Sequence, residues 1–325
     1  MTVFTRRRVI ALGTTTLALP SSLRAQAAWP ISPVTFVVGY VPGGSTDING
    51  RELAAVMSPI LGQPIVVDNK GGATGSIGLR AVANAKPDGY TLFYAVSTNV
   101  IINPHVQKGM IDTIASLAPI CQTNAYQYVL AVNPKVPANT VAELVALARK
   151  DPDKLTFSSA GVGAGTHLAG VLFVEATGIR ITHVPYKGTG PALADVISGQ
   201  ITMEFSTLPS AVPQIKVGNL KALAVTGDQR LKPLPDVPTL RELGIDVTAY
   251  GWQGLFAPAK TPNVLLDKIE KDAKQAMKDP KWEEALAKDG VELPPERSRA
   301  EFARYVADEH AFWGKKLKAM KIDMD

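Results

Sequence analysis

Two glycine-rich turns stand at equivalent places in the two halves of the chain, each between a β-rich run and a helical pattern. The first spans residues 42–47 (Pro-Gly-Gly-Ser-Thr-Asp), and the second spans residues 159–167 (Ser-Ala-Gly-Val-Gly-Ala-Gly-Thr-His). Such a turn leaves backbone N–H groups free at a helix N-terminus, where the helix dipole adds about half a positive charge. Each turn could therefore hold one carboxylate or phosphate without any lysine. Four hydroxyl donors could assist, those of Ser45, Thr46, Ser159 and Thr166.

Taken singly, each turn is also compatible with an ordinary strand-to-helix connection, in which glycine supplies a positive φ angle and a polar residue caps the helix. Asp47 is the clearest case, because a carboxylate in the first helical turn caps more often than it binds a ligand. Two turns facing each other across a cleft would instead suit a small dianion, since crevices in α/β proteins lie at the carboxyl ends of strands. Both interpretations stay open at this point.

Other patterns that carry chemistry are weak in this chain. Residues 161–165 do not make the dinucleotide fingerprint G-x-G-x-x-G, and the next β-rich run ends in His-Val-Pro rather than an acid. The four histidines lack metal-ligand spacing, and Ser76 lacks the glycine that begins a nucleophile elbow. Cys121 stands in an apolar stretch typical of a core. The residues therefore give no strong sign of an enzyme, and we expect no cofactor and no metal.

The turns belong to a regular alternation of β-rich runs and helical patterns. The β-rich runs are residues 34–40, 63–68, 90–96, 155–159, 179–185, 201–205 and 220–226. The helical patterns are residues 45–61, a segment ending at 85, 140–150, 166–176 and 191–198, followed by a charged amphipathic tail at 263–278, 281–288 and 298–320. This alternation predicts an α/β fold of mostly parallel sheets with helices on both faces.

The basic charge of the chain is concentrated at its N-terminus. The 325 residues carry 34 Lys+Arg against 29 Asp+Glu, but four arginines lie in the first 27 residues, which contain no acid. Without this segment 30 bases face 29 acids, so the surplus that nucleic-acid binding requires is missing. A hydrophobic content of 46% excludes disorder, and the length suits two domains.

Residues 1–27 have the pattern of an export signal that is removed. Residues 1–8 are basic, residues 9–20 are apolar, and residues 25–27 (Ala-Gln-Ala) form an A-x-A cleavage site. The apolar stretch is shorter than the ~20 residues of a membrane span. Residues 5–10 also fit the twin-arginine pattern, so folded and general secretory export both remain open. We therefore expect a mature protein that is soluble and lies outside the cytoplasm.

Nine segments carry a family resemblance, and they occur in order along the mature chain. They are residues 41–48 with Arg51, 61–69, 86–92, 102–104, 159–170, 183–188, 208–211, 223–226 and 234–239. Together they resemble the periplasmic solute receptors of tripartite tricarboxylate transporters, also called Bug proteins. The resemblance implies a monomer of type II-like two-domain periplasmic-binding-protein fold that closes on a small carboxylate and delivers it to membrane permease subunits. It places the first domain at residues 28–125 and 253–325 and the second at residues 126–252.

The resemblance also implies where the ligand binds. One ligand carboxylate would be held by the two glycine turns, with further walls at Ser97-Thr98 and Ser206-Thr207. The implied ligand-binding residues are Tyr40, Gly43, Gly44, Ser45, Thr46, Asp47, Ser97, Thr98, Ser159, Ala160, Gly161, Gly163, Gly165, Thr166, His167, Ser206 and Thr207.

Two departures from the family pattern bear on the ligand. The family commonly has an aspartate before Leu-Pro-Ser, where this chain has Ser206-Thr207, which argues against an amino-acid ligand. Ser45 replaces a frequent third glycine and adds a donor, while Tyr40 could flank a ring. A di- or tricarboxylate is therefore expected, with an aromatic dicarboxylate such as terephthalate included. A periplasmic hydrolase or transferase on the same scaffold, or a ligand sensor for a membrane kinase, remains the alternative.

Overall fold

The computed structural model describes residues 29–320, so the export signal predicted at residues 1–27 lies outside the described residues. The strands are β1 (Val34–Val38), β2 (Ile65–Asn69), β3 (Thr91–Val96), β4 (Leu117–Val132), β5 (Thr156–Ser159), β6 (Thr182–Pro185), β7 (Met203–Thr207), β8 (Lys221–Val225) and β9 (Tyr250–Pro258). The helices are α1 (Ser45–Leu61), η1 (Ala73–Gly75), α2 (Ser76–Ala83), α3 (Ser97–Ile101), α4 (Asn103–Val106), α5 (Thr113–Ser116), α6 (Val141–Lys150), α7 (Gly165–Thr177), α8 (Thr189–Ser198), α9 (Leu208–Lys216), α10 (Asn263–Ala276), α11 (Pro280–Asp289) and α12 (Arg299–Met320).

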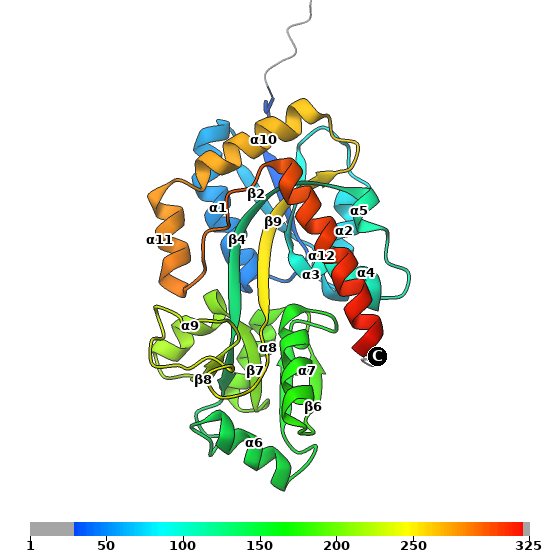
Figure 1. The fold of residues 1–325 in the computed structure, drawn as a ribbon. Coiled ribbons are helices and arrows are strands. Elements are labelled where there is room, and N and C mark those ends of the chain that lie inside the picture. Colours follow the sequence, from blue (N-terminus) through cyan, green and yellow to red (C-terminus); the bar gives the residue numbers. More distant parts are fainter. Residues whose placement is uncertain (1–28, 321–325) are drawn as a thin grey trace, which may run out of the picture.

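The strands form one path in the order β2-β1-β3-β9-β4-β7-β5-β6, with β8 paired to β4. The outer strands are parallel within each half of this path, β2-β1-β3 at one end and β7-β5-β6 at the other. The long strands β9 and β4 pair antiparallel to their neighbours and join the two halves. Figure 1 shows the result, an α/β molecule of two lobes, which confirms the predicted fold class. We call the part containing β1–β3 the first lobe and the part containing β5–β8 the second lobe.

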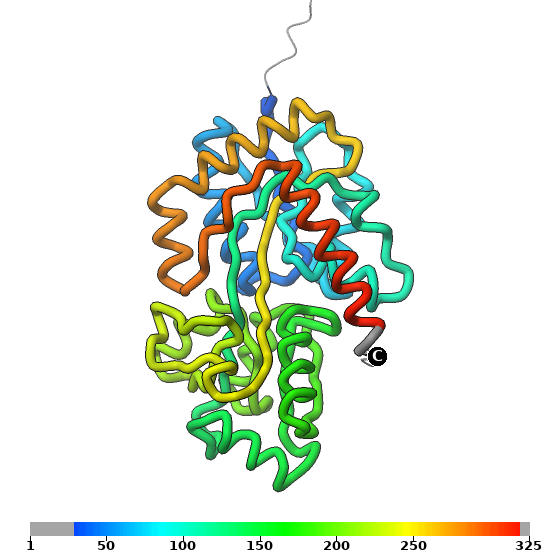
Figure 2. The backbone as a smooth tube through the Cα atoms, in the orientation of Figure 1, coloured from blue at the N-terminus to red at the C-terminus, as the bar shows by residue number. Residues whose placement is uncertain are grey.

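The chain passes between the lobes along β4 and at the start of β9, as the tube in Figure 2 shows. β4 pairs with β9 from Leu117 to Gln127 and with β7 from Tyr128 to Val132. Both ends of the described chain, including the C-terminal helices, therefore lie in the first lobe. The domain boundaries at residues 125/126 and 252/253 fall inside these two strands and stay a prediction.

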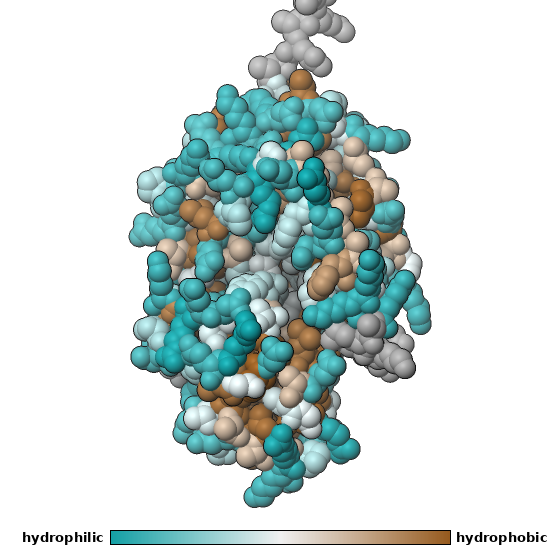
Figure 3. All heavy atoms as spheres, in the orientation of Figure 1, coloured by the Kyte–Doolittle hydropathy of each residue, from teal (hydrophilic) through white to brown (hydrophobic). Residues whose placement is uncertain are grey.

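Alternate residues of the first-lobe strands pack into two separate cores, so helices cover both faces of this sheet. Phe36 and Tyr94 belong to the core that includes Leu53 of α1, whereas Val37 and Phe93 belong to the core that includes Phe302 of α12. The period of two is the one that a sheet buried on both faces requires. The tail helices turn most of their charged residues outward, with Asp272 and Asp289 buried, and Figure 3 shows hydrophilic residues over most of the face in view. Among residues 29–320, no helix is long and apolar enough to cross a membrane.

Candidate ligand-binding site

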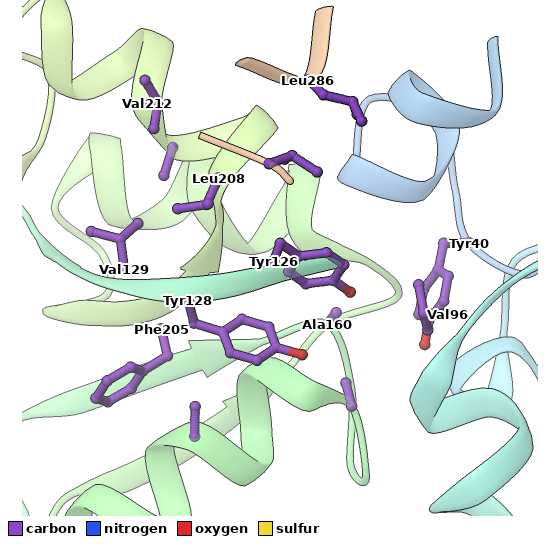
Figure 4. Packing of buried hydrophobic residues seen from close by; sticks show 14 of the residues in the cluster. Tyr40, Val96, Tyr126, Tyr128, Val129, Ala160, Phe205, Leu208, Val212 and Leu286 are labelled. Carbon is purple, nitrogen blue, oxygen red and sulfur yellow. The ribbon is translucent and has the colours of Figure 1, made fainter. Parts of the chain in front are cut away.

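A cavity of about 30 Å³ lies between the two lobes, at the carboxyl ends of β1 and β3. Figure 4 shows Tyr126 and Tyr128 of the second lobe with their hydroxyls turned toward Ala160, and Tyr40 and Val96 of the first lobe facing them. The lining contains hydroxyls, backbone and aromatic rings, with no charged side chain. Its members are Tyr40, Gly44, Ser45, Thr46, Val96, Thr98, Tyr126, Tyr128, Ala160, Ala164, Gly165, Thr166, Thr189 and Thr207.

Four helices of nine or more residues begin at this cavity. The caps of α1, α7, α8 and α9 are Gly44, Ala164, Gly188 and Thr207, and none of these caps makes a side-chain hydrogen bond to its helix. The first N–H groups of each helix are therefore not satisfied by a capping side chain. Because each N-terminus carries about half a positive charge, the cavity is electropositive without a lysine or arginine.

The loop before α1 is held by the carboxylate of Asp47. Its Oδ2 accepts a hydrogen bond from the backbone N–H of Gly43 at 2.9 Å, and its Oδ1 pairs with Arg51 at 2.8 Å. Burial alone would raise the pKa of Asp47, but hydrogen bonds from Arg51, Gly43 and Asn69 together hold that pKa below its ordinary value. Gly43 has φ of +87°, a conformation that glycine adopts without strain. Asp47 therefore shapes the first turn and leaves the cavity lining to Ser45 and Thr46.

The second turn is held in the same way by side chains that point into the second lobe. The Ala160 N–H donates to Thr166 Oγ1 at 2.9 Å, and the Gly163 N–H donates to His167 Nδ1 at 3.2 Å. Ser159 Oγ accepts from the Gly161 N–H at 3.1 Å and lies 2.7 Å from Nε2 of His183. These bonds fix the backbone on which α7 begins.

A stack of three rings lies beneath the second turn. The His167 and His183 rings are 4.1 Å apart, and the Phe157 ring stacks on His183 at 4.7 Å. Burial lowers the pKa of His167 to about 3, with a further contribution from His183, and burial lowers the pKa of His183 to about 4. Both imidazoles are neutral at pH 7, so His167 Nδ1 can accept the Gly163 N–H.

This stack predicts a loss of stability in mild acid. Because the folded pKa values lie below the unfolded value of about 6.5, only the unfolded chain gains these protons between pH 6.5 and 4, and stability falls over that window. At pH 5 the free energy of unfolding should be about 2–4 kcal/mol lower than at pH 7 through these two groups. Urea unfolding at both pH values measures the loss.

In the double variant His167→Asn, His183→Gln, the fall in the free energy of unfolding between pH 7 and pH 5 should be at least ~2 kcal/mol smaller than in the wild type. Each single variant, His167→Asn or His183→Gln, should show a loss between those of the double variant and the wild type. An equal loss in the double variant and the wild type would contradict the assignment.

The two lobes touch at the rim of the cavity. Thr74 Oγ1 in the first lobe donates to the Val162 carbonyl oxygen in the second at 2.8 Å. The Thr74 carbonyl is itself fixed by the side-chain amides of Asn99 and Asn103, at 2.8 and 2.7 Å. A Cβ on Gly161 would come within 2.8 Å of Thr74 Oγ1, so only glycine permits this approach. The two lobes are therefore linked beside the cavity by a hydrogen bond from a side chain of the first lobe to the backbone of the second turn.

Comparisons with known proteins agree with this geometry. The model of the tripartite tricarboxylate transporter family receptor matches residues 50–322. The chain belongs to this receptor family. Protein BugT of Bordetella pertussis is 32% identical over 313 residues, which cover 94% of this chain and 93% of BugT.

Two solved structures of Rhodopseudomonas palustris proteins have the same fold as this receptor. MatC with bound malate has a TM-score of 0.84 and 28% identity, covering 88% of this chain and 99% of MatC. Rpa4515 with adipate has a TM-score of 0.85 and 32% identity, covering 89% of this chain and 97% of Rpa4515. The predicted family and the two-domain periplasmic-binding-protein fold are confirmed.

The receptor brings about half of the predicted site residues to the cavity. Those that line it are Tyr40, Gly44, Ser45, Thr46, Thr98, Ala160, Gly165, Thr166 and Thr207. Those that do not are Gly43, Asp47, Ser97, Ser159, Gly161, Gly163, His167 and Ser206. Most of the second group are buried behind the turns and bond to their backbone, while Ser97 lines a neighbouring cavity and Ser206, one residue before Thr207, has its side chain on the opposite face of β7. Their direct contact with ligand stays a prediction.

Five lining residues of this receptor were not predicted as site residues: Val96, Tyr126, Tyr128, Ala164 and Thr189. Tyr126 and Tyr128 are two apart on β4, so both turn to one face, and their rings meet edge to face at 5.6 Å. The spacing of two between these tyrosines was the sequence signal that could have placed both on one wall of the site. Thr189 begins α8, directly after the Gly188 cap, and could have been found by treating this turn like the other two.

Proposed function

We propose that this receptor binds a small dicarboxylate between its lobes in the periplasm and delivers it to the membrane permease subunits of a tripartite tricarboxylate transporter. The observation that carries the proposal is the meeting of four uncapped helix N-termini in a cavity without charged side chains. Fixed backbone dipoles attract carboxylates and need no countercharge of their own. Malate in MatC and adipate in Rpa4515 are both dicarboxylates, which supports this ligand class.

Two features favour an aromatic dicarboxylate as one member of the class. Three buried tyrosines, Tyr40, Tyr126 and Tyr128, stand around the cavity. A second cavity of about 330 Å³ lies on the other side of the wall formed by Thr98, Tyr128 and Gly165, and it is lined by several further aromatic rings. A movement of the Tyr128 ring would join the two spaces and make room for a ligand such as terephthalate.

A receptor explains the second lobe better than a hydrolase does. Ser159 is the serine that contacts a histidine, but it has no exposed surface and its Oγ already accepts the Gly161 N–H. A nucleophile must reach its substrate, whereas a serine that only stabilises a turn need not. We therefore propose that the chain binds without turnover and that residues 28–125 with 253–325, and residues 126–252, move as the closing domains.

The proposal is tested by ligand-induced stabilisation of the mature protein, residues 28–325. Malate, adipate and terephthalate are compared with glucose and putrescine in thermal unfolding. A bound dicarboxylate at about 100 times its Kd should raise the free energy of unfolding by ~2.7 kcal/mol. Stabilisation by glucose or putrescine, with none by any dicarboxylate, would overturn the proposal.

A further inference from the structure

A buried chain of hydrogen bonds runs from the β4–β9 ladder to the cavity. The backbone N–H of Gln253 donates to Asn124 Oδ1 at 3.2 Å, and Asn124 Nδ2 donates to Gln253 Oε1 at 2.8 Å. Gln253 Nε2 then donates to Ser45 Oγ at 3.2 Å. Gln253 and Asn124 have no exposed surface, and only Ser45 lines the cavity.

The direction of this chain is fixed at its first bond. A backbone N–H can only donate, so the atom of Asn124 that faces it must be the oxygen, and the Asn124 amide nitrogen must face Gln253. Gln253 Oε1 also accepts from Asn49 Nδ2 and from the Tyr94 hydroxyl, both at 2.9 Å. With three donors around Oε1, the amide of Gln253 cannot be reversed without leaving buried donors unsatisfied. Its nitrogen is therefore the atom that faces Ser45.

Gln253 therefore fixes the hydrogen-bonding role of Ser45 from the side away from the cavity. Its Oγ accepts from Gln253, so its own proton is free to point elsewhere, and the side chain opens on the cavity at the N-terminus of α1. We propose that Gln253 is a positioning residue that makes Ser45 a donor toward the ligand and thereby selects acceptor groups such as carboxylates over groups that donate. This inference rests on the proposed carboxylate site.

Gln253→Glu tests the inference, because a carboxylate keeps the three donors satisfied but accepts from Ser45 and turns its proton away from the cavity. The probes are adipate and its neutral diamide, adipamide, titrated by calorimetry. The ratio of the Kd for adipamide to the Kd for adipate, which measures the preference for adipate, should fall at least tenfold. Gln127→Glu is the matched control, since Gln127 is a buried glutamine of β4 that bonds Gly227 and Gln229 instead, and its ratio should stay within twofold.

Ser45→Ala shows whether the effect of Gln253→Glu depends on the Ser45 hydroxyl or only on the added negative charge. Ser45→Ala alone should also lower the preference for adipate, and Gln253→Glu should then change the ratio by less than threefold. A tenfold effect that persists without the Ser45 hydroxyl would show that charge carries it, and would overturn the inference. An unchanged ratio in Ser45→Ala would do the same, even if Gln253→Glu failed to fold. Failure of the wild type to bind any dicarboxylate would instead remove the proposed function.

Discussion

Replacing Thr207 by aspartate is expected to lower the affinity for dicarboxylates by about three orders of magnitude. Thr207 is buried, lines the cavity and is the N-cap of α9. A carboxylate here would face the ligand in a site without opposing side-chain charge. For two like charges at an assumed separation of about 4 Å and an effective dielectric constant of 20, the repulsion is about 4 kcal/mol, or roughly 10³ in Kd. Isothermal titration with adipate or malate measures the loss.

The stability of the same variant should move in the opposite direction. Aspartate is a good N-cap, and Thr207 makes no capping bond, so the free energy of unfolding should be unchanged or higher by about 0.5–1 kcal/mol. Thr207→Asn is the control of equal size without charge, and it should keep the affinity within about tenfold. Equal losses in both variants would mean that space, rather than charge, decides binding at this position.

This experiment also addresses the departure from the family pattern at residues 206–207. The family pattern that the sequence resembles has an aspartate at this place, and the sequence did not tell which of the two residues lines the binding site. The structure places Thr207 at the cavity, while Ser206 Oγ is buried without a hydrogen-bond partner among residues 29–320. Thr207 is therefore the position at which an acid would act on the ligand.

The parts of the site that could be predicted from the sequence are those that local chemistry determines. Helix α1 begins at Ser45 and ends at Leu61 as its periodicity and its glycine turn predict, and α7 begins within one residue of the predicted start. Both glycine-rich turns could be predicted from short segments in which glycine, hydroxyl residues and a helical period occur together. The alternating β-rich runs likewise predicted the α/β class.

The two crossing strands were missed for a physical reason. β4 is buried on both faces over most of its length, so its residues show no alternation of apolar and polar types. It also contains Gln122, Thr123 and Asn124, which resemble a loop in sequence but are buried and hydrogen-bonded by distant residues. Such partners come from tertiary structure, and a single sequence does not display them.

The predicted roles of His167 and Ser159 failed to include their partner for the same reason. Each contacts His183, which is 16 residues from His167 and belongs to a different strand, β6. The pattern of residues 159–167 indicated an anion-binding turn, but it could not show that its three polar side chains, Ser159, Thr166 and His167, all bond the backbone of the turn itself. A turn that must hold free N–H groups toward a ligand needs such internal supports.

Gly165→Ala is expected to weaken dicarboxylate binding about 100-fold, the second largest effect of a single substitution. Gly165 is the first residue of α7, and a Cβ there would lie 1.8 Å from the hydroxyl oxygen of Tyr128 and 2.7 Å from its Cζ. Because the Tyr128 side chain is buried, either the ring moves into the cavity or the start of α7 moves away by more than 1 Å. Either movement disturbs the site at the N–H groups that begin α7. Overpacking of this size also lowers the free energy of unfolding by about 1–3 kcal/mol.

A second-site variant and a matched glycine make the cause of this loss testable by titration with adipate. Tyr128→Phe removes the closest atom, so the pair Gly165→Ala, Tyr128→Phe should recover part of the affinity, and Gly165→Ala, Tyr128→Leu should recover more. Gly178→Ala stands at the far end of the same helix, where a Cβ meets nothing within 4 Å; its φ of +63° makes the substitution cost stability, but its Kd should change less than fivefold. Wild-type affinity in Gly165→Ala would exclude the N-terminus of α7 from the site. No recovery in either double variant would show that the Tyr128 contact is not what makes glycine necessary at the start of this helix.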